Sequence, residues 1–199
     1  QFLLFDNPSE IEFAALMAQH YRIRVISSES EAKQITALCK GKSESYVTHA
    51  FMFFACRDLI RFRDSGKGDN QAINAELGVT NQVKHLNKFP EFQSLTMDSI
   101  QKIATEIWGE QALQTQIMAD EMSHLIQPYP IQYIRKFNDL SHKKKSQLKL
   151  FNQISQDLNK IRDRAIIDLA MQEFKSYKTV IPIFGGGHAK SCYEGFVYV

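Results

Sequence analysis

The first forty residues alternate between short apolar runs and longer amphipathic segments. The run "FLLF" at 2–5 predicts a strand, and the spacing of apolar residues in "IEFAALMAQH" at 11–20 predicts a helix. "YRIRVIS" at 21–27 alternates as a strand does, and "SESEAKQITALCK" at 28–40 is again amphipathic, with Gly41 as its stop. This strand–helix–strand–helix order predicts two parallel strands joined by a right-handed crossover.

Helical patterns dominate the middle of the chain. Residues 43–64 carry a heavy load of aromatic side chains and predict a long helix. Residues 65–71 are interpreted as a turn or mobile loop, and the stretch from there to about residue 94 as irregular or weakly helical. "TMDSIQKIATEIWG" at 96–109 predicts a capped amphipathic helix that ends at its glycine, and residues 110–126 predict another. We therefore expect a helical insertion over about residues 43–140, between two α/β halves.

The longest periodic segment covers residues 140–177 and leads into a final apolar run. Its apolar stripe consists of Leu148, Phe151, Ile154, Leu158, Ile161, Ala165 and Leu169. "KTVIPIF" at 178–184 predicts the last strand. The chain is therefore predicted to be a single α/β domain over residues 1–199, with a small parallel sheet as its core and a large helical insertion.

Composition and charge narrow the classes of function. The 199 residues are 44% hydrophobic and 23% charged, with a net charge of +2, so bulk electrostatics do not favour nucleic acid or an anionic membrane. No apolar run approaches the roughly 18 residues of a membrane span. Cys39, Cys56 and Cys192 have unrelated spacings that fit neither a disulfide framework nor a zinc motif, and the first two are expected to be buried thiols. With no signal peptide visible, these features favour the cytoplasm.

A glycine-rich segment with one histidine follows the last predicted strand. Gly185, Gly186, Gly187 and His188 come directly after "TVIPIF", and open α/β sheets place their sites at such strand ends. Glycines there let a ligand approach the backbone and leave amide groups available to bind it. The alternative is a glycine-rich turn with an incidental histidine.

An acidic residue follows the predicted strand 21–27. Glu29 occupies the position equivalent to that of His188, so the two are expected to meet at one rim of the sheet. A carboxylate and an imidazole there could share a metal ion, or act as a base and the group that orients it. The alternative for Glu29 is an acid in the first turn of a helix, where the helix dipole favours it.

A polar stripe runs beside the apolar stripe of the long helix. Asn159 and Arg162 belong to it, with Asp163 adjacent, and all three are candidates to bind a ligand. Polar residues that flank a buried stripe often cap a pocket, but they are as often a solvated helix edge. Arg162 could instead form a structural ion pair with Asp163 or Glu29.

Two segments together resemble the TraB/Tiki/ChaN-like superfamily. Residues 6–31, "DNPSEIEFAALMAQHYRIRVISSESE", resemble its helix–strand–acid segment, and residues 158–189, "LNKIRDRAIIDLAMQEFKSYKTVIPIFGGGHA", resemble its closing segment with an Arg-Asp pair and a G-x-x-H motif. The superfamily also has a motif of a glycine, an acid and a histidine after its first strand, which this sequence lacks. Because the chain also opens inside an apparent strand, we expect a further segment before Gln1.

The resemblance implies an α/β core and a polar site at Glu29, Arg162 and His188, with Gly185 as the glycine of the G-x-x-H motif. It favours a metal-dependent hydrolase, peptidase- or esterase-like, acting on a small-molecule or peptide substrate. His188 and Glu29 would be metal ligands or bases, Arg162 would clamp developing negative charge, and a divalent metal ion would lower the pKa of a water molecule.

Two other functions stay open on the sequence. The first is a non-catalytic binding module in which His188 contacts a cofactor such as haem and the helical insertion forms the pocket wall. The second is an interaction protein with a degenerate site, which would use the aromatic-rich helix 43–64 against a partner.

Overall fold

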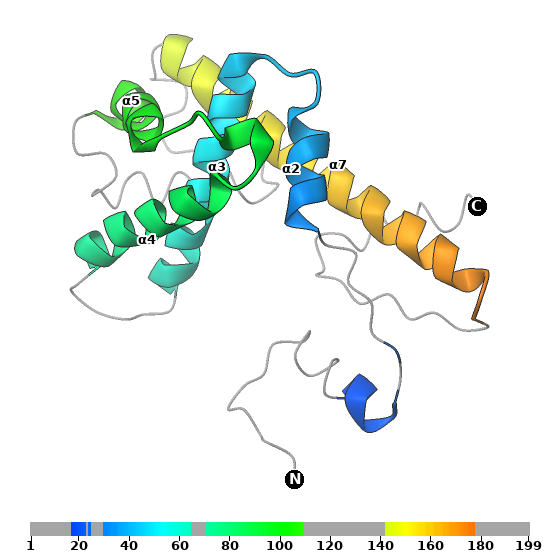
Figure 1. Ribbon diagram of the computed structural model, residues 1–199. Coiled ribbons are helices and arrows are strands. Elements are labelled where there is room, and N and C mark those ends of the chain that lie inside the picture. Colours follow the sequence, from blue (N-terminus) through cyan, green and yellow to red (C-terminus); the bar gives the residue numbers. More distant parts are fainter. Residues whose placement is uncertain (1–16, 23, 25–29, 65–70, 110–141, 178–199) are drawn as a thin grey trace. The chain divides into compact units, whose positions relative to one another are not determined.

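The computed structural model describes residues 17–22, 24, 30–64, 71–109 and 142–177 (Figure 1). This described part is 81% helical and contains no strand. Its helices are α2 (Glu31–Cys39), α3 (Glu44–Asp64), α4 (Gln71–Leu86), the 3-10 helix η1 (Pro90–Phe92), α5 (Met97–Trp108) and α7 (His142–Phe174).

The predicted α/β class is wrong for the part of the chain that the structure describes. A strand is expected at 21–27, but the first residues of this segment form the end of a helix instead. Residues 17–20 are helical, and the amide of Tyr21 donates to the carbonyl of Met17 at 3.0 Å. The amide of Arg22 donates to the carbonyl of Gln19 at 3.2 Å, and Arg22 has a φ of 55°, which turns the chain. The strands expected at 2–5 and 178–184 lie outside the described residues.

The chain divides into two compact units. One comprises residues 1–30 and 159–199, and the other residues 31–158. In the described part of the first unit, Arg24 contacts residues that are distant in the sequence. Its guanidinium donates to the hydroxyl of Tyr177 at 3.1 Å and lies 3.7 Å from the carboxylate of Glu173.

The second unit is built around α3. Its segment Ala50–Cys56, seven consecutive residues, is at most 1% exposed. A helix that is apolar on every face must be covered on every face, and α2, α4, α5 and η1 all pack against α3. The aromatic side chains of Tyr46, Phe51, Phe53 and Phe54 therefore serve the core of this unit, and the helix predicted over 43–64 is confirmed.

Aromatic side chains join α3 to η1. The ring of Phe92 lies 5.4 Å from that of Phe51 and 6.1 Å from that of Phe54, measured between centroids. All three side chains are at most 1% exposed. Tilted aromatic pairs at these separations add to the stabilisation that burial alone provides.

Helix α5 matches its prediction closely. The amide of Thr96 donates to the hydroxyl of Ser99 at 3.3 Å where the helix begins. Its buried residues Ile100, Ile103, Ala104 and Ile107 repeat at three and four. It ends at Gly109, whose φ of 94° is open to glycine and strained for other residues.

The apolar stripe of α7 is buried only along its first half. Leu148, Phe151, Ile154 and Leu158 are at most 5% exposed, and all belong to the second unit. The continuation of the predicted stripe, Ile161, Ala165 and Leu169, is half-buried. The change in burial coincides with the boundary between the units, after Leu158.

Candidate functional site

The predicted site lies largely outside the described residues. Glu29, Gly185, Gly186, Gly187 and His188 are not among them, so their predicted meeting stays a prediction. The remaining three, Asn159, Arg162 and Asp163, lie on α7 and are all half-buried. The sheet rim on which the site was expected has no counterpart among the described residues.

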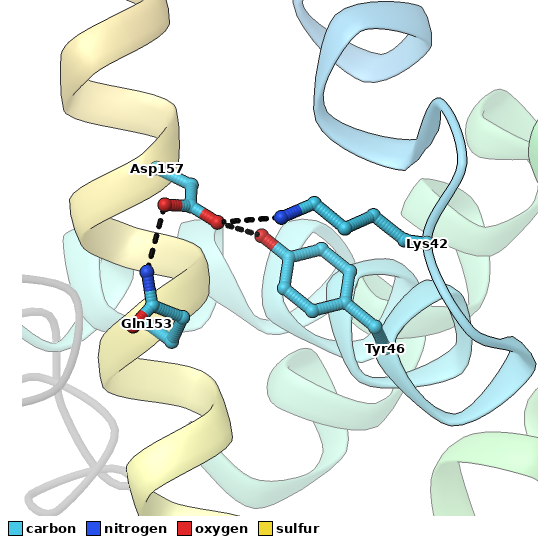
Figure 2. Close-up of polar contacts among 4 residues, drawn as sticks. All are labelled: Lys42, Tyr46, Gln153 and Asp157. Atoms are coloured by element: carbon cyan, nitrogen blue, oxygen red, sulfur yellow. Dashed lines mark hydrogen bonds and ion pairs between the residues drawn. The ribbon is translucent and has the colours of Figure 1, made fainter.

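The best-defined polar cluster in the described residues centres on Asp157 of α7 (Figure 2). One oxygen of Asp157, Oδ2, accepts a hydrogen bond from Nζ of Lys42 at 3.0 Å and another from the hydroxyl of Tyr46 at 2.9 Å. The other oxygen accepts from Nε2 of Gln153 at 2.8 Å. Lys42 also lies 4.6 Å above the centre of the Tyr46 ring.

The local sequence positions these groups. Gly41, with a φ of 68°, ends α2 and turns the chain, so that Lys42 and Tyr46 flank the beginning of α3. Gln153 and Asp157 are four residues apart on α7 and therefore lie one above the other on the same helix face. The cluster thus connects the α2–α3 turn to α7.

Hydrogen bonding decides the charge of this cluster. Desolvation tends to raise the pKa of Asp157, but the hydrogen bonds from Lys42, Tyr46 and Gln153 outweigh it and lower that pKa below its usual value of 3.8. Burial first, and then the bond to Asp157, raise the pKa of the Tyr46 hydroxyl well above its usual range. At neutral pH the carboxylate is therefore ionised and the phenol protonated, which suits a structural contact better than proton transfer.

Sequence reasoning did not find this cluster. Asp157 stands immediately before Leu158 of the buried stripe, and an acid at the edge of such a stripe indicates that a partner is needed. Nothing in the local pattern identifies that partner, because Tyr46 is 111 positions away.

A second polar group lies inside the same unit. His49 of α3 is 5% exposed, and its ring is 5.1 Å from that of Phe151 on α7. Its Nδ1 lies 2.7 Å from the carbonyl oxygen of Ser45, one turn earlier in α3. Its Nε2 is buried and has no hydrogen-bond partner among the described residues.

Burial governs the protonation of His49. Desolvation lowers the pKa of its imidazole and outweighs the bond to Ser45 and the nearby charge of Glu106, which both act to raise it. A neutral imidazole whose Nδ1 faces a carbonyl must carry its proton on Nδ1. Nε2 therefore presents a lone pair to the interior.

The two buried cysteines agree with their prediction. Cys39 and Cys56 are 7% and 1% exposed. Burial raises the pKa of Cys39 to about 11, with a smaller contribution from Glu91, and that of Cys56 to about 12. Both thiols are thus protonated and weakly reactive near neutral pH. Cys192 lies outside the described residues.

A pair of partly exposed residues joins α2 to α4. Nε2 of His85 lies 2.7 Å from a carboxylate oxygen of Glu31, and the His85 ring meets that of Phe89 edge to face. Both side chains are in contact with solvent. This geometry fits a surface link between two helices.

The described residues contain no cluster of three or more histidine, cysteine, aspartate or glutamate side chains suited to a metal ion. Within the same residues, none of the helices has both the length and the hydropathy that crossing a membrane requires.

Comparison with known proteins gave no relative. The sequence matches no family model and no curated protein, and the structure matches no solved structure.

Proposed function

We propose that the chain is a metal-assisted hydrolase, peptidase- or esterase-like, that uses Glu29, Arg162 and His188. The observation that carries the proposal is the order of these groups in the sequence: an acid at 29, an Arg-Asp pair at 162–163, and a G-x-x-H segment at 185–188. The proposal keeps these residues from the superfamily resemblance and drops the parallel sheet, for which the described residues give no support.

The position of Arg162 supports its proposed role. It lies on α7, the longest helix described, at a half-buried position next to Asp163. A guanidinium held by a rigid helix and partly shielded from water acts more strongly on developing negative charge than one on a mobile surface loop. Asn159, one turn earlier on the helix, could add a hydrogen bond to the substrate.

The other residues have distinct proposed tasks. The His188 imidazole and the Glu29 carboxylate hold the metal ion or accept a proton, and both are residue types that bind divalent metals. The glycines at 185–187 leave backbone amides open to the substrate. A bound divalent metal ion would supply a water molecule with a lowered pKa.

Activity assays with matched variants test the proposal. The full chain is assayed against ester and peptide substrates with added Zn²⁺ or Mn²⁺, alongside His188→Ala, Arg162→Met and, as control, the exposed His20→Ala. We expect His188→Ala and Arg162→Met to lose at least about 100-fold in kcat/KM, as removal of one electrostatic donor does elsewhere. Activity that survives His188→Ala, or a wild-type chain that is silent with every metal, would contradict the proposal.

Haem addition distinguishes the alternative binding role. If the chain is a haem-binding module, mixing it with haem shifts the Soret band, and His188→Ala abolishes the shift. The hydrolase proposal expects no shift that depends on His188.

A further inference from the structure

Three helices of the second unit bring polar groups to one place. Gln147 of α7 donates from Nε2 to a carboxylate oxygen of Glu106 on α5 at 2.7 Å. Phe151, one turn after Gln147, lies against the ring of His49 on α3. The charge of Glu106 also acts on His49, so the two side chains are close enough to interact electrostatically.

Two acceptor atoms of this group are buried without a hydrogen-bond partner. They are Nε2 of His49 and Oε1 of Gln147, which have no partner among the described residues. Leaving such an atom unpaired costs about 1–3 kcal/mol each. A metal cation, which accepts lone pairs, would offset this cost. A further hydrogen-bond acceptor, which offers a lone pair itself, would not.

The contact of His49 with a backbone carbonyl favours the tautomer that a metal ligand needs. Histidines that bind metals almost always direct the other ring nitrogen to a carbonyl, a carboxylate or water, which fixes the tautomer. Here Nδ1 faces the Ser45 carbonyl, and Nε2 is left as the ligand atom.

We propose that His49, Glu106 and Gln147 form a binding site for one divalent transition-metal ion of the Zn²⁺ class, between α3, α5 and α7. The donor set is one imidazole nitrogen, one carboxylate and one amide oxygen. Imidazole favours Zn²⁺ and its neighbours, whereas Mg²⁺ and Ca²⁺ prefer oxygen alone. This donor set has only one histidine and one acidic side chain, and its third donor is an amide. It therefore differs from a cluster of three or more histidine, cysteine or acidic side chains. It uses none of the residues assigned to the site proposed around His188.

Zinc titration of the full chain tests this site. The chain is stripped with EDTA, dialysed and titrated with Zn²⁺ by calorimetry, as wild type, His49→Phe, Gln147→Met and His188→Ala. Phenylalanine keeps an aromatic ring against Phe151 and removes the nitrogen ligand. We expect His49→Phe to weaken one binding step at least about tenfold, and Gln147→Met to weaken the same step.

The variants separate this proposal from the hydrolase proposal. His188→Ala should leave the His49-dependent step intact, and His49→Phe should leave any His188-dependent step intact. If His49→Phe does not fold by circular dichroism, Gln147→Met decides alone. A chain that binds no zinc, or whose zinc binding is the same in wild type, His49→Phe and Gln147→Met, overturns the proposal and leaves a buried water molecule as the partner of Nε2.

Discussion

The hydroxyl of Tyr46 lies 2.9 Å from Oδ2 of Asp157, which connects the start of α3 to the middle of α7. Because the phenol stays protonated and the carboxylate stays ionised, the contact is a charge-assisted hydrogen bond, and such bonds are about twice as strong as neutral ones. Lys42 and Gln153 donate to the same carboxylate, so the four residues act as one polar contact (Figure 2).

Removing the Tyr46 hydroxyl should weaken this contact measurably. We expect Tyr46→Phe to lower the free energy of unfolding by about 1–2 kcal/mol, because it removes one donor to a partly buried charge while the ring stays in place. Urea unfolding followed by circular dichroism measures the change. Tyr21→Phe, at a tyrosine that is 63% exposed, is the control and should change the stability little. Equal effects of the two substitutions would show that the Tyr46 bond contributes nothing specific.

His49 should make the stability depend on pH in the mildly acidic range. Its pKa in the folded chain is below its usual value of 6.5, so the unfolded chain binds more protons as the pH falls through 6.5. The stabilising contribution is therefore complete above about pH 6.5 and declines below it, by at most about 1.4 kcal/mol per pH unit.

Urea unfolding between pH 7.5 and 5, in EDTA, compares the wild type with His49→Phe. The variant lacks the titrating group, so its unfolding midpoint should fall less steeply with decreasing pH. Parallel curves for the two proteins would contradict the lowered pKa.

The aromatic contact between α3 and η1 should contribute strongly to stability. We expect Phe92→Ala to cost about 3–5 kcal/mol, because the side chain is fully buried against Phe51 and Phe54 and its removal leaves a cavity. Phe174→Ala, at a phenylalanine that is 46% exposed, should change the stability by only about 0.5 kcal/mol. Thermal unfolding compares the loss of stability in the two variants. A smaller loss for Phe92→Ala than for Phe174→Ala would refute this packing.

The end of α5 depends on the backbone conformation of Gly109. Its φ of 94° and ψ of −178° fall in a region that is essentially restricted to glycine, although a Cβ atom there would meet nothing within 4 Å. We expect Gly109→Ala to cost about 1–3 kcal/mol from backbone strain alone. Gly41→Ala, at a φ of 68° near the left-handed helical minimum, should cost less. Chemical denaturation of both variants measures the two losses of stability. A larger loss for Gly41→Ala than for Gly109→Ala would contradict the prediction.

The helices were predictable where one apolar face repeats over several turns. The segments expected at 28–40, 43–64, 96–109 and 140–177 contain α2, α3, α5 and α7. Periodicity, capping residues and glycine stops are local properties, so the sequence reveals them directly. The burial of Ala50–Cys56 on every face of α3 also fits the aromatic content of this segment.

Two segments were misjudged for physical reasons. The sequence pattern of the stretch up to about residue 94 predicts irregular or weakly helical structure, but α4 forms there. Val79, Val83 and Leu86 nevertheless form a buried stripe, and packing against α3 outweighs propensity. At 21–27, an alternation of only two apolar residues suggested a strand, but helical hydrogen bonding extends into Tyr21.

The polar contacts were harder to predict than the helices. Asp157 with Tyr46, and Gln147 with Glu106, come from segments far apart in the chain, and no pattern within one segment encodes their pairing. The predicted residues Asn159, Arg162 and Asp163 are half-buried on α7. The meeting of His188 with Glu29 stays a prediction.

The metal content of the purified full chain tests the hydrolase proposal most directly. Elemental analysis compares the wild type with His188→Ala and with the control His20→Ala. We predict that His188→Ala loses one equivalent of divalent metal ion and that His20→Ala retains the wild-type content. Equal metal content in wild type and His188→Ala, or a wild-type chain without metal after dialysis against Zn²⁺ and Mn²⁺, would contradict it.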